Sequence, residues 1–255
     1  MTLLTLLEKA YGSYSTRNFE SELESLCQGL KVRIEVLETT TQGWVQVELH
    51  GEDEPVARQF LDQEIGIALV SADRVSKFMN VRGKIFNSRE SASELHVDIG
   101  VFAPAAYPVI IPLSTLRAQL MDGRDVTLRH TADFYCLHDH MPLQVKVLGD
   151  LDSTKGVWSA ELSEVQLSLF SNWLMINLDR LIVLGASRRE VQGEVQRAGH
   201  ARDIVKIEVL GPLEHALECK LGTDAVGLMP KLGRRLRKAS LLPFSPRKIK
   251  KELGW

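Results

Sequence analysis

The sequence predicts an α+β protein with a central five-stranded β-barrel of the OB type, flanked by two small β-α-β-β-α (ferredoxin-like) modules. Three observations lead to this expectation. Helical and strand-like patterns of apolar residues alternate at both ends of the chain. Residues 76–150 instead contain short strands separated by Gly and Pro. The two ends also share a strand sequence, "VRIEVL" at 32–37 and "VKIEVL" at 205–210, which suggests a structural repeat, although such strands also recur by coincidence.

Residues 1–75 form the first expected module. The stretch 2–12 has the composition of a strand, and 16–30 places Phe19 and Leu23 at helical spacing. The segments "KVRIEVLET" and "WVQVELH" alternate apolar and polar residues, which is typical of two half-buried strands joined as a hairpin. The stretch "EDEPVARQFLDQEIG" then predicts a second helix, because Pro and acidic residues are favourable in a first helical turn.

Residues 76–150 are expected to form the barrel. Gly and Pro punctuate this region, and one short helix is expected within "STLRAQLMD". Five short strands with one helix are the content of an OB-type barrel. The candidate strands are "VRGKIF", "ELHVDIGV", "PVIIPL", "RDVTLR" and "LQVKVL".

Residues 151–238 form the second expected module. After a strand in "VWSAELS", the apolar stretch "EVQLSLFSNWLMIN" predicts a buried helix that ties the domains together. A strand, a helix capped by Ser187, a hairpin that includes "HALECKLG" and a helix capped by Thr223 or Asp224 follow. Residues 239–255 are expected to be an extended basic tail, because Pro243 and Pro246 interrupt regular structure.

Charge is unevenly distributed along the chain. Nine of the 31 Lys and Arg residues lie between Lys231 and Lys251, a span without an acidic residue, while the net charge of the whole chain is −2. The C-terminal end is therefore basic and the remainder acidic. Such an end can bind phosphates with an affinity that falls steeply as salt rises. Two alternatives are a solvated tail and a tail folded onto the acidic body.

The barrel segment carries motifs of a known family. They are Gly83-Lys84-Ile85, the "VDIG" of residues 97–100, the "LSTL" of residues 113–116 and the "GRDV" of residues 123–126. In these motifs the segment resembles the RNA-binding barrel found in the largest small-subunit ribosomal protein of bacteria. The resemblance covers under a third of the chain and implies an OB-type fold and RNA binding.

The sequence departs from that family at the positions that stack on bases. The residues found there are Ser93, His96 and Pro112, of which only His96 has a ring. Because stacking on a ring contributes about 1–3 kcal/mol per base, the barrel is expected to contact phosphates or to serve as a docking module.

The stretch from residue 202 to 236, "RDIVKIEVLGPLEHALECKLGTDAVGLMPKLGRRL", resembles an uncharacterised archaeal family of unknown function. The resemblance extends to most of the chain and implies an archaeal origin. It implies no activity.

Few residues suggest catalysis or metal binding. On an extended strand Cys136, His138 and His140 would share one face and could bind zinc with a fourth ligand, but a polar loop that leads into the strand "LQVKVL" explains them better. Glu214 and His215 are expected on the surface of a hairpin. The metalloprotease, nucleophile-elbow, P-loop and Rossmann motifs are absent from the sequence. No cofactor is therefore expected, and the separated cysteines fit a reducing cytoplasm.

These observations favour a non-enzymatic, cytoplasmic RNA-associated adaptor of the archaeal translation or transcription machinery. Its partner would be RNA or a ribonucleoprotein, and no membrane contact is expected. The alternatives are a protein-interaction module without nucleic-acid contact and a metal-dependent enzyme using the Cys136–His140 cluster. The expected RNA-contacting residues are Lys84, Arg89, His96, Arg124, Lys231, Arg234, Arg235, Arg237, Lys238, Arg247, Lys248, Lys250 and Lys251.

Overall fold

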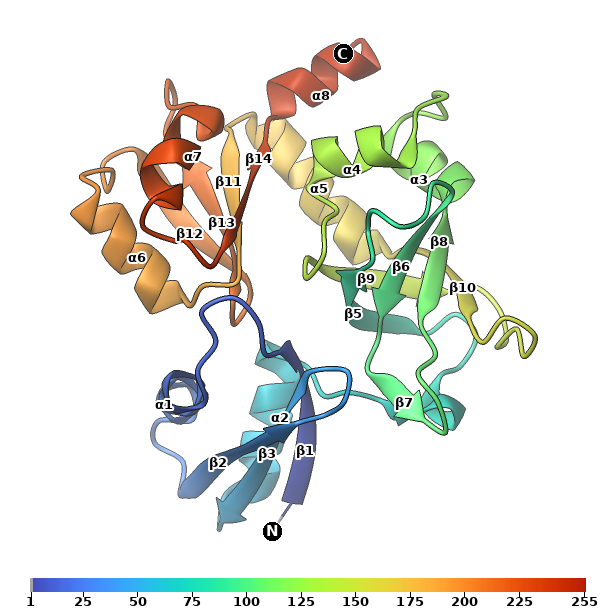
Figure 1. Cartoon of the computed structure of the whole chain (residues 1–255), viewed down its shortest axis with the longest axis vertical. Helices are drawn as coiled ribbons and strands as arrows, with labels where there is room; N and C mark the ends of the chain where they lie inside the picture. Colours follow the sequence, from blue (N-terminus) through green and yellow to red (C-terminus); the bar gives the residue numbers. More distant parts are fainter. Residues whose placement is uncertain (1) are drawn as a thin grey trace.

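Two small α/β units and a barrel make up the part of the chain that the computed structural model describes, residues 2–255 (Figure 1). The mixed α+β class and the central closed five-stranded barrel agree with the sequence prediction. Within residues 2–255, none of the helices combines the length and apolar character needed to cross a bilayer.

The N-terminal module is a three-stranded antiparallel sheet in the order β1-β3-β2, with two helices. Ser15 caps the first helix by accepting a hydrogen bond from the backbone N–H of Asn18. After the second helix, Ile67 forms a single antiparallel bridge with Leu6 of β1, so a fourth strand is reduced to one residue pair. The elements are β1 (Thr2–Lys9), α1 (Thr16–Leu26), β2 (Val32–Thr39), β3 (Trp44–Gly51) and α2 (Glu54–Glu64).

The C-terminal module has a four-stranded antiparallel sheet in the order β12-β13-β11-β14. Its elements follow the β-α-β-β-α-β order of the ferredoxin-like motif. Ser187 and Asp224 cap its two helices, as the sequence predicts. The elements are β11 (Arg180–Leu184), α6 (Arg188–Arg197), β12 (Ile204–Gly211), β13 (Glu214–Cys219), α7 (Ala225–Gly233) and β14 (Ser240–Phe244).

The two modules share a topology. Taken in chain order, both sheets place the third strand between the first and the second. The similar sequences lie in equivalent strands, residues 32–37 in β2 and residues 205–210 in β12. The predicted repeat is therefore present in the topology. The C-terminal module has a full fourth strand, β14, where the N-terminal module has the Leu6–Ile67 bridge.

The barrel closes in the order β10-β8-β6-β5-β9, with one parallel pair between β8 and β10. A short bridge segment, β4 (Val70–Ser71) with η1 (Ala72–Arg74), leads into it and pairs with β7 (Val101–Ala103). Two helices lie between β8 and β9. The elements are β5 (Asn80–Phe86), β6 (Glu94–Asp98), β8 (Val109–Pro112), α3 (Leu113–Leu120), α4 (Leu128–Tyr135), β9 (Pro142–Val147) and β10 (Trp158–Leu162).

One predicted barrel strand is wrong. The stretch 124–129, expected as a strand, is a loop that leads into α4. The Thr127 hydroxyl accepts from the His130 N–H and so starts a helix where the apolar alternation suggested a strand. The fifth strand is β10, which the sequence placed in the C-terminal module. The barrel therefore extends to Leu162.

The helix α5 (Glu164–Ile176) joins the barrel to the C-terminal module, as its apolar sequence predicts. Its Phe170 lies 5.2 Å from Tyr135 of α4, and its Trp173 lies 5.1 Å from Phe244 of β14, between ring centroids. These rings belong to a hydrophobic core that contains both barrel residues and Ile182 of β11. The barrel and the C-terminal module therefore share a core.

The prediction that residues 239–255 form an extended tail is also wrong. Residues 239–255 contain β14, which pairs with β11, and the helix α8 (Pro246–Leu253). Pro243 is tolerated because β14 is an edge strand, and Pro246 occupies a first helical position. Phe244, Ile249 and Leu253 are buried in the shared core, so both elements are integral to the fold.

The substitution Phe244→Ala should lower the free energy of unfolding by about 3–5 kcal/mol, because it opens a cavity among the core rings. Urea denaturation measures the effect. Arg247→Gln, at an exposed position three residues after Phe244, is the control and should change stability by less than about 0.5 kcal/mol. Equal effects of the two substitutions would contradict the structural role of this segment.

Candidate functional site

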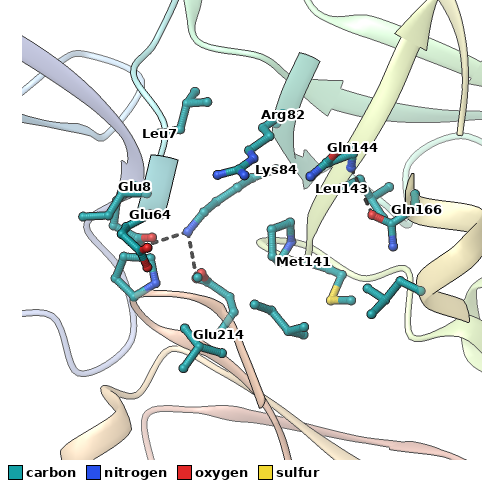
Figure 2. A pocket seen from close by; sticks show the side chains of 18 of the residues that line it. Leu7, Glu8, Glu64, Arg82, Lys84, Met141, Leu143, Gln144, Gln166 and Glu214 are labelled. Atoms are coloured by element: carbon teal, nitrogen blue, oxygen red, sulfur yellow. Dashed lines mark hydrogen bonds and ion pairs between the residues drawn. The ribbon is translucent and has the colours of Figure 1, made fainter. Parts of the chain in front are cut away.

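A buried ion triad lies where the three units meet (Figure 2). Lys84 of β5 is 2% exposed, and its Nζ donates to Glu8 Oε1 at 2.8 Å and to Glu214 Oε1 at 2.7 Å. Glu8 lies in β1 and Glu214 in β13, so each unit contributes one member. Both carboxylates are fully buried.

Aromatic side chains enclose the triad. The Tyr11 hydroxyl donates to Glu214 Oε1, and its ring centroid lies 5.4 Å from Lys84 Nζ. The ring of His140 stacks on the Tyr11 ring with a centroid distance of 3.8 Å. These groups keep water from the ammonium group, so its interactions with the carboxylates act in a low-dielectric environment.

The pKa values follow from burial and charge. Burial, helped by the charge of Glu214, raises the pKa of Glu8 to about 8, although Lys84 opposes the shift. Burial disfavours the charged form of Lys84, but the two carboxylates outweigh it and raise the pKa of this lysine. The folded protein therefore holds a proton on Glu8 up to a higher pH than the unfolded chain does.

The predicted role of Lys84 in phosphate binding is wrong. A cavity of about 260 Å³ lies beside the triad, lined also by Arg82, Gln144 and Gln166, but the ammonium group of Lys84 is already neutralised by its two partners. Lys84 points outward from the barrel, but both flanking modules cover it, so that it is buried in the whole protein. Its role in this structure is to fix the units relative to one another.

The side chain of His96, which was predicted to contact RNA, is partly accessible. Its side chain is half-buried in β6, and its ring lies 5.7 Å from that of Phe86. Further along the same face, Asp98 forms an ion pair with Lys9 of β1 at 2.6 Å. The N-terminal module therefore covers one end of this barrel face, and a base could reach only the end at His96 and Phe86.

Arg124 was predicted to contact RNA, but its guanidinium group makes contacts within the protein. Its guanidinium donates to the carbonyl groups of Glu252 and of Leu253, the latter at 2.5 Å. These are carbonyl groups at the C-terminal end of α8, where a cation is favourable. The side chain of Glu252 also lies 3.2 Å from His130 Nε2 of α4. Arg124 therefore helps to attach α8 to the barrel helices.

The basic residues of the C-terminal end separate into two clusters, which flank the two ends of β14. The α7 cluster lies at or just after the end of α7, and its Arg235 is 3.5 Å from Glu194 of α6. The α8 cluster lies on the helix face opposite the buried Ile249 and Leu253. The α7 cluster is Lys231, Arg234, Arg235, Arg237 and Lys238, and the α8 cluster is Arg247, Lys248, Lys250 and Lys251.

The α8 cluster continues onto the barrel helices. A hollow of about 240 Å³ between α4 and the β14–α8 segment is lined by His130 and Lys248. On the other side of α4, a cavity of about 560 Å³ is lined by Arg89, Arg117 and Arg129. Asp133 of α4 lines both, so the two hollows adjoin. We call the five basic residues around these two hollows the α4 surface; they are Arg89, Arg117, Arg129, His130 and Lys248.

Sequence reasoning missed Arg117 and Arg129. It placed Arg129 in a strand that does not form, and it did not single out Arg117 in the short helix. No signal in the linear sequence brings these residues close to Arg89, because Arg89 belongs to the β5–β6 loop. The packing of this loop against α3 and α4 brings the three arginines around one cavity.

The Cys136, His138 and His140 side chains do not converge. Cys136 ends α4 with a left-handed conformation, φ 57°, and its thiol is buried, which raises its pKa. His138 Nε2 lies 3.5 Å from Asp133, whereas His140 stacks on Tyr11. The segment is a helix end and a loop, not the extended strand that would put all three on one face. In residues 2–255 no group of three potential metal ligands is present.

Glu214 and His215 are not on a hairpin surface. Both are buried in β13, between β11 and β12. Burial lowers the pKa of the His215 imidazole to about 4. The prediction is wrong because β13 is an inner strand of a sheet that β14 completes.

The comparisons with known proteins find a family that covers the two outer modules. Residues 4–68 match the DUF2110 N-terminal domain and residues 178–242 match the DUF2110 C-terminal domain. Together these matches span half of the chain, which belongs to the DUF2110 family. No curated protein matches the chain. The two matched regions correspond to the N- and C-terminal modules, with the barrel between them.

The substitution Lys84→Met should lower the free energy of unfolding by about 3–5 kcal/mol, because it leaves two buried carboxyl groups without their cation. Lys31→Met is the matched control. Lys31 pairs with Glu52 at the same 2.8 Å distance, but both side chains are exposed, so its loss should cost about 0–1 kcal/mol. Chemical denaturation of both variants measures the difference, and similar costs would argue against a buried triad.

The substitution Glu8→Gln should change how stability depends on pH. Between pH 4.5 and about 8 the folded protein holds a proton on Glu8 that the unfolded chain has released, so this group's contribution to stability is lost as pH rises through that window. The substitution removes this contribution. The unfolding free energy of the wild type minus that of Glu8→Gln should therefore decrease from about pH 5 to about pH 8. A difference that stays flat, or increases, across this range would contradict the raised pKa.

Proposed function

We propose that this protein is a non-enzymatic RNA-associated adaptor that grips the RNA backbone with the α4 surface and the adjoining α8 cluster. The observation that carries the proposal is the continuity of this basic surface. It runs from Arg89 in the β5–β6 loop across α4 to Lys248, and α8 adds Arg247 and Lys251 at exposed positions. Cations that are spread over several elements suit a strand of phosphates.

The barrel topology supports this proposal. In chain order its strands close in the ring 1-2-3-5-4, with the third and fifth parallel, which is the arrangement of OB-type barrels. Such barrels bind oligonucleotides with the face of strands 2 and 3 and with nearby loops, including the loop between strands 1 and 2. Arg89 belongs to that loop here. The resemblance to the ribosomal barrel points in the same direction.

Recognition of the RNA would depend little on its sequence. His96 and Phe86 offer a ring surface at one end of the barrel face, while the N-terminal module covers the other end through the Lys9–Asp98 pair. Contacts with phosphate position a protein on nucleic acid but do not read bases. We therefore infer an adaptor that recognises RNA in the archaeal translation or transcription machinery by its backbone and shape.

The test compares two triple variants that each remove three exposed cations. Arg247→Gln/Lys248→Gln/Lys251→Gln neutralises the outward face of α8. Lys231→Gln/Arg234→Gln/Arg237→Gln, in the α7 cluster, is the charge-matched control. In fluorescence anisotropy with a labelled single-stranded RNA, the α8 variant should bind more weakly, and its slope of log affinity against log salt should be shallower by about 2. The control should retain most of the affinity.

The outcomes separate the proposal from its alternative. If both variants keep the wild-type affinity and salt slope, the α8 cluster is not the RNA contact. If the wild type binds no tighter than about 10⁻⁴ M at physiological salt, direct RNA binding is excluded. A partner complex that survives nuclease treatment would then favour a protein-interaction module.

A further inference from the structure

The cavity lined by Arg89, Arg117 and Arg129 suits a more specific ligand than the surface around it. We propose that it binds the terminal nucleotide of an RNA strand through a phosphomonoester group. This inference rests on the proposed RNA association and names the part of the RNA that the site would take. The cavity has a volume of about 560 Å³, within the range of about 300–1,000 Å³ found for sites of small organic ligands.

Three arginines reach this cavity from separate segments. Arg89 comes from the β5–β6 loop, Arg117 from α3 and Arg129 from the first turn of α4. Arg117 is held in place, since its Nε donates to the Val126 carbonyl at 2.7 Å and its Nη2 lies 2.7 Å from Asp125. This arginine serves as a fixed wall of the cavity.

The other two guanidinium groups are available. Arg89 and Arg129 are exposed, and within residues 2–255 no carboxylate lies within ion-pair distance of either. Guanidinium groups bind phosphate oxygens through paired, charge-assisted hydrogen bonds. A phosphomonoester carries nearly two negative charges at neutral pH, and so matches two free guanidinium groups better than an internal diester does.

The carboxylates at the rim narrow the choice of ligand. Glu90 and Asp133 also line the cavity, and Asp133 lies 3.5 Å from His138 Nε2. The net positive charge is therefore modest, and binding would depend on directed hydrogen bonds from Arg89 and Arg129. A terminal phosphate, with several acceptor oxygens in a compact space, meets this requirement better than a single phosphodiester of the RNA backbone does.

The floor of the cavity is apolar. It is formed by Leu113, Leu128, Ala132 and Leu137, of which the last three are buried. A ribose or a base can lie on this floor while its phosphate meets the rim. The cavity lining contributed by residues 2–255 contains no Phe, Tyr or Trp, and the imidazole of His138 is already 3.5 Å from Asp133, so the base would contribute little specificity. The site would therefore recognise the end of a strand whatever its last base.

The experiment measures binding of three otherwise identical short RNAs, with a 5′-phosphate, a 3′-phosphate or hydroxyl groups at both ends. AMP and adenosine are the matched small probes. The wild type should bind one phosphorylated RNA at least about tenfold more tightly than the hydroxyl-ended RNA, and AMP more tightly than adenosine. The better of the two phosphorylated strands identifies the end. Arg89→Gln/Arg129→Gln should abolish both preferences, whereas Lys231→Gln/Arg234→Gln should retain them.

The result that overturns the inference differs from the one that overturns the RNA proposal. Equal binding of all three RNAs, with salt-dependent affinity intact, excludes the terminal site and leaves the RNA proposal standing. Binding of AMP that depends on Arg89 and Arg129, without binding of any RNA, overturns both the RNA proposal and the assignment to an RNA end, and leaves a site for a free nucleotide. A preference for phosphate that persists in Arg89→Gln/Arg129→Gln also overturns the assignment. Circular dichroism of both double variants checks that these exposed substitutions leave the fold intact.

Discussion

The arrangement of this protein depends on the pairing of Lys84 with Glu8 and Glu214. Each of the three ionisable side chains comes from a different unit, and all three are buried. Buried ion pairs add little net stability, because removing charges from water costs about as much as their attraction returns. A unit that lost its position would, however, leave a buried charge without a partner. The triad therefore specifies one relative placement of the units more than it strengthens any one of them.

Close packing around the triad supports the same placement. Gly12 and Gly185 bring the N- and C-terminal modules into backbone contact, and the Ser13 N–H donates to the Gly185 carbonyl at 2.8 Å. Gly12 has φ +62°, and a methyl group on it would collide with the Gly185 backbone. A side chain at either position would separate the modules. On the opposite side, α5 and Phe244 bind the barrel to the C-terminal module through a common core.

This rigid arrangement decides which cations are available to a partner. Lys84 is neutralised in the interior, Lys9 is paired with Asp98, and Arg124 holds the end of α8. Apart from Arg89 in the β5–β6 loop, those that remain exposed across the α4 surface and α8 lie on helices that pack against the core. The proposed phosphate-binding surface would therefore lose little conformational freedom on binding, since mainly side chains would become ordered.

The sequence by itself determined the local elements and their order. Helical spacing around Phe19 and Leu23, alternation in β2 and β12, and the caps Ser187 and Asp224 depend on neighbours in the chain, and they formed as expected. The strand repeat marked two modules of related topology for the same reason. Local patterns also placed most of the barrel strands correctly.

Tertiary structure alone decided the roles of the charged residues. Lys84 looked like a surface lysine until two other units covered it, and the basic C-terminal end looked extended until β11 offered an edge for β14. Arg89, Arg117 and Arg129 share a cavity only because a loop packs against two helices. Burial, charge pairing and sheet completion are long-range effects between distant segments. The spacing of residues along the chain therefore predicts the secondary structure of each segment, but it does not predict which distant residues its side chains contact.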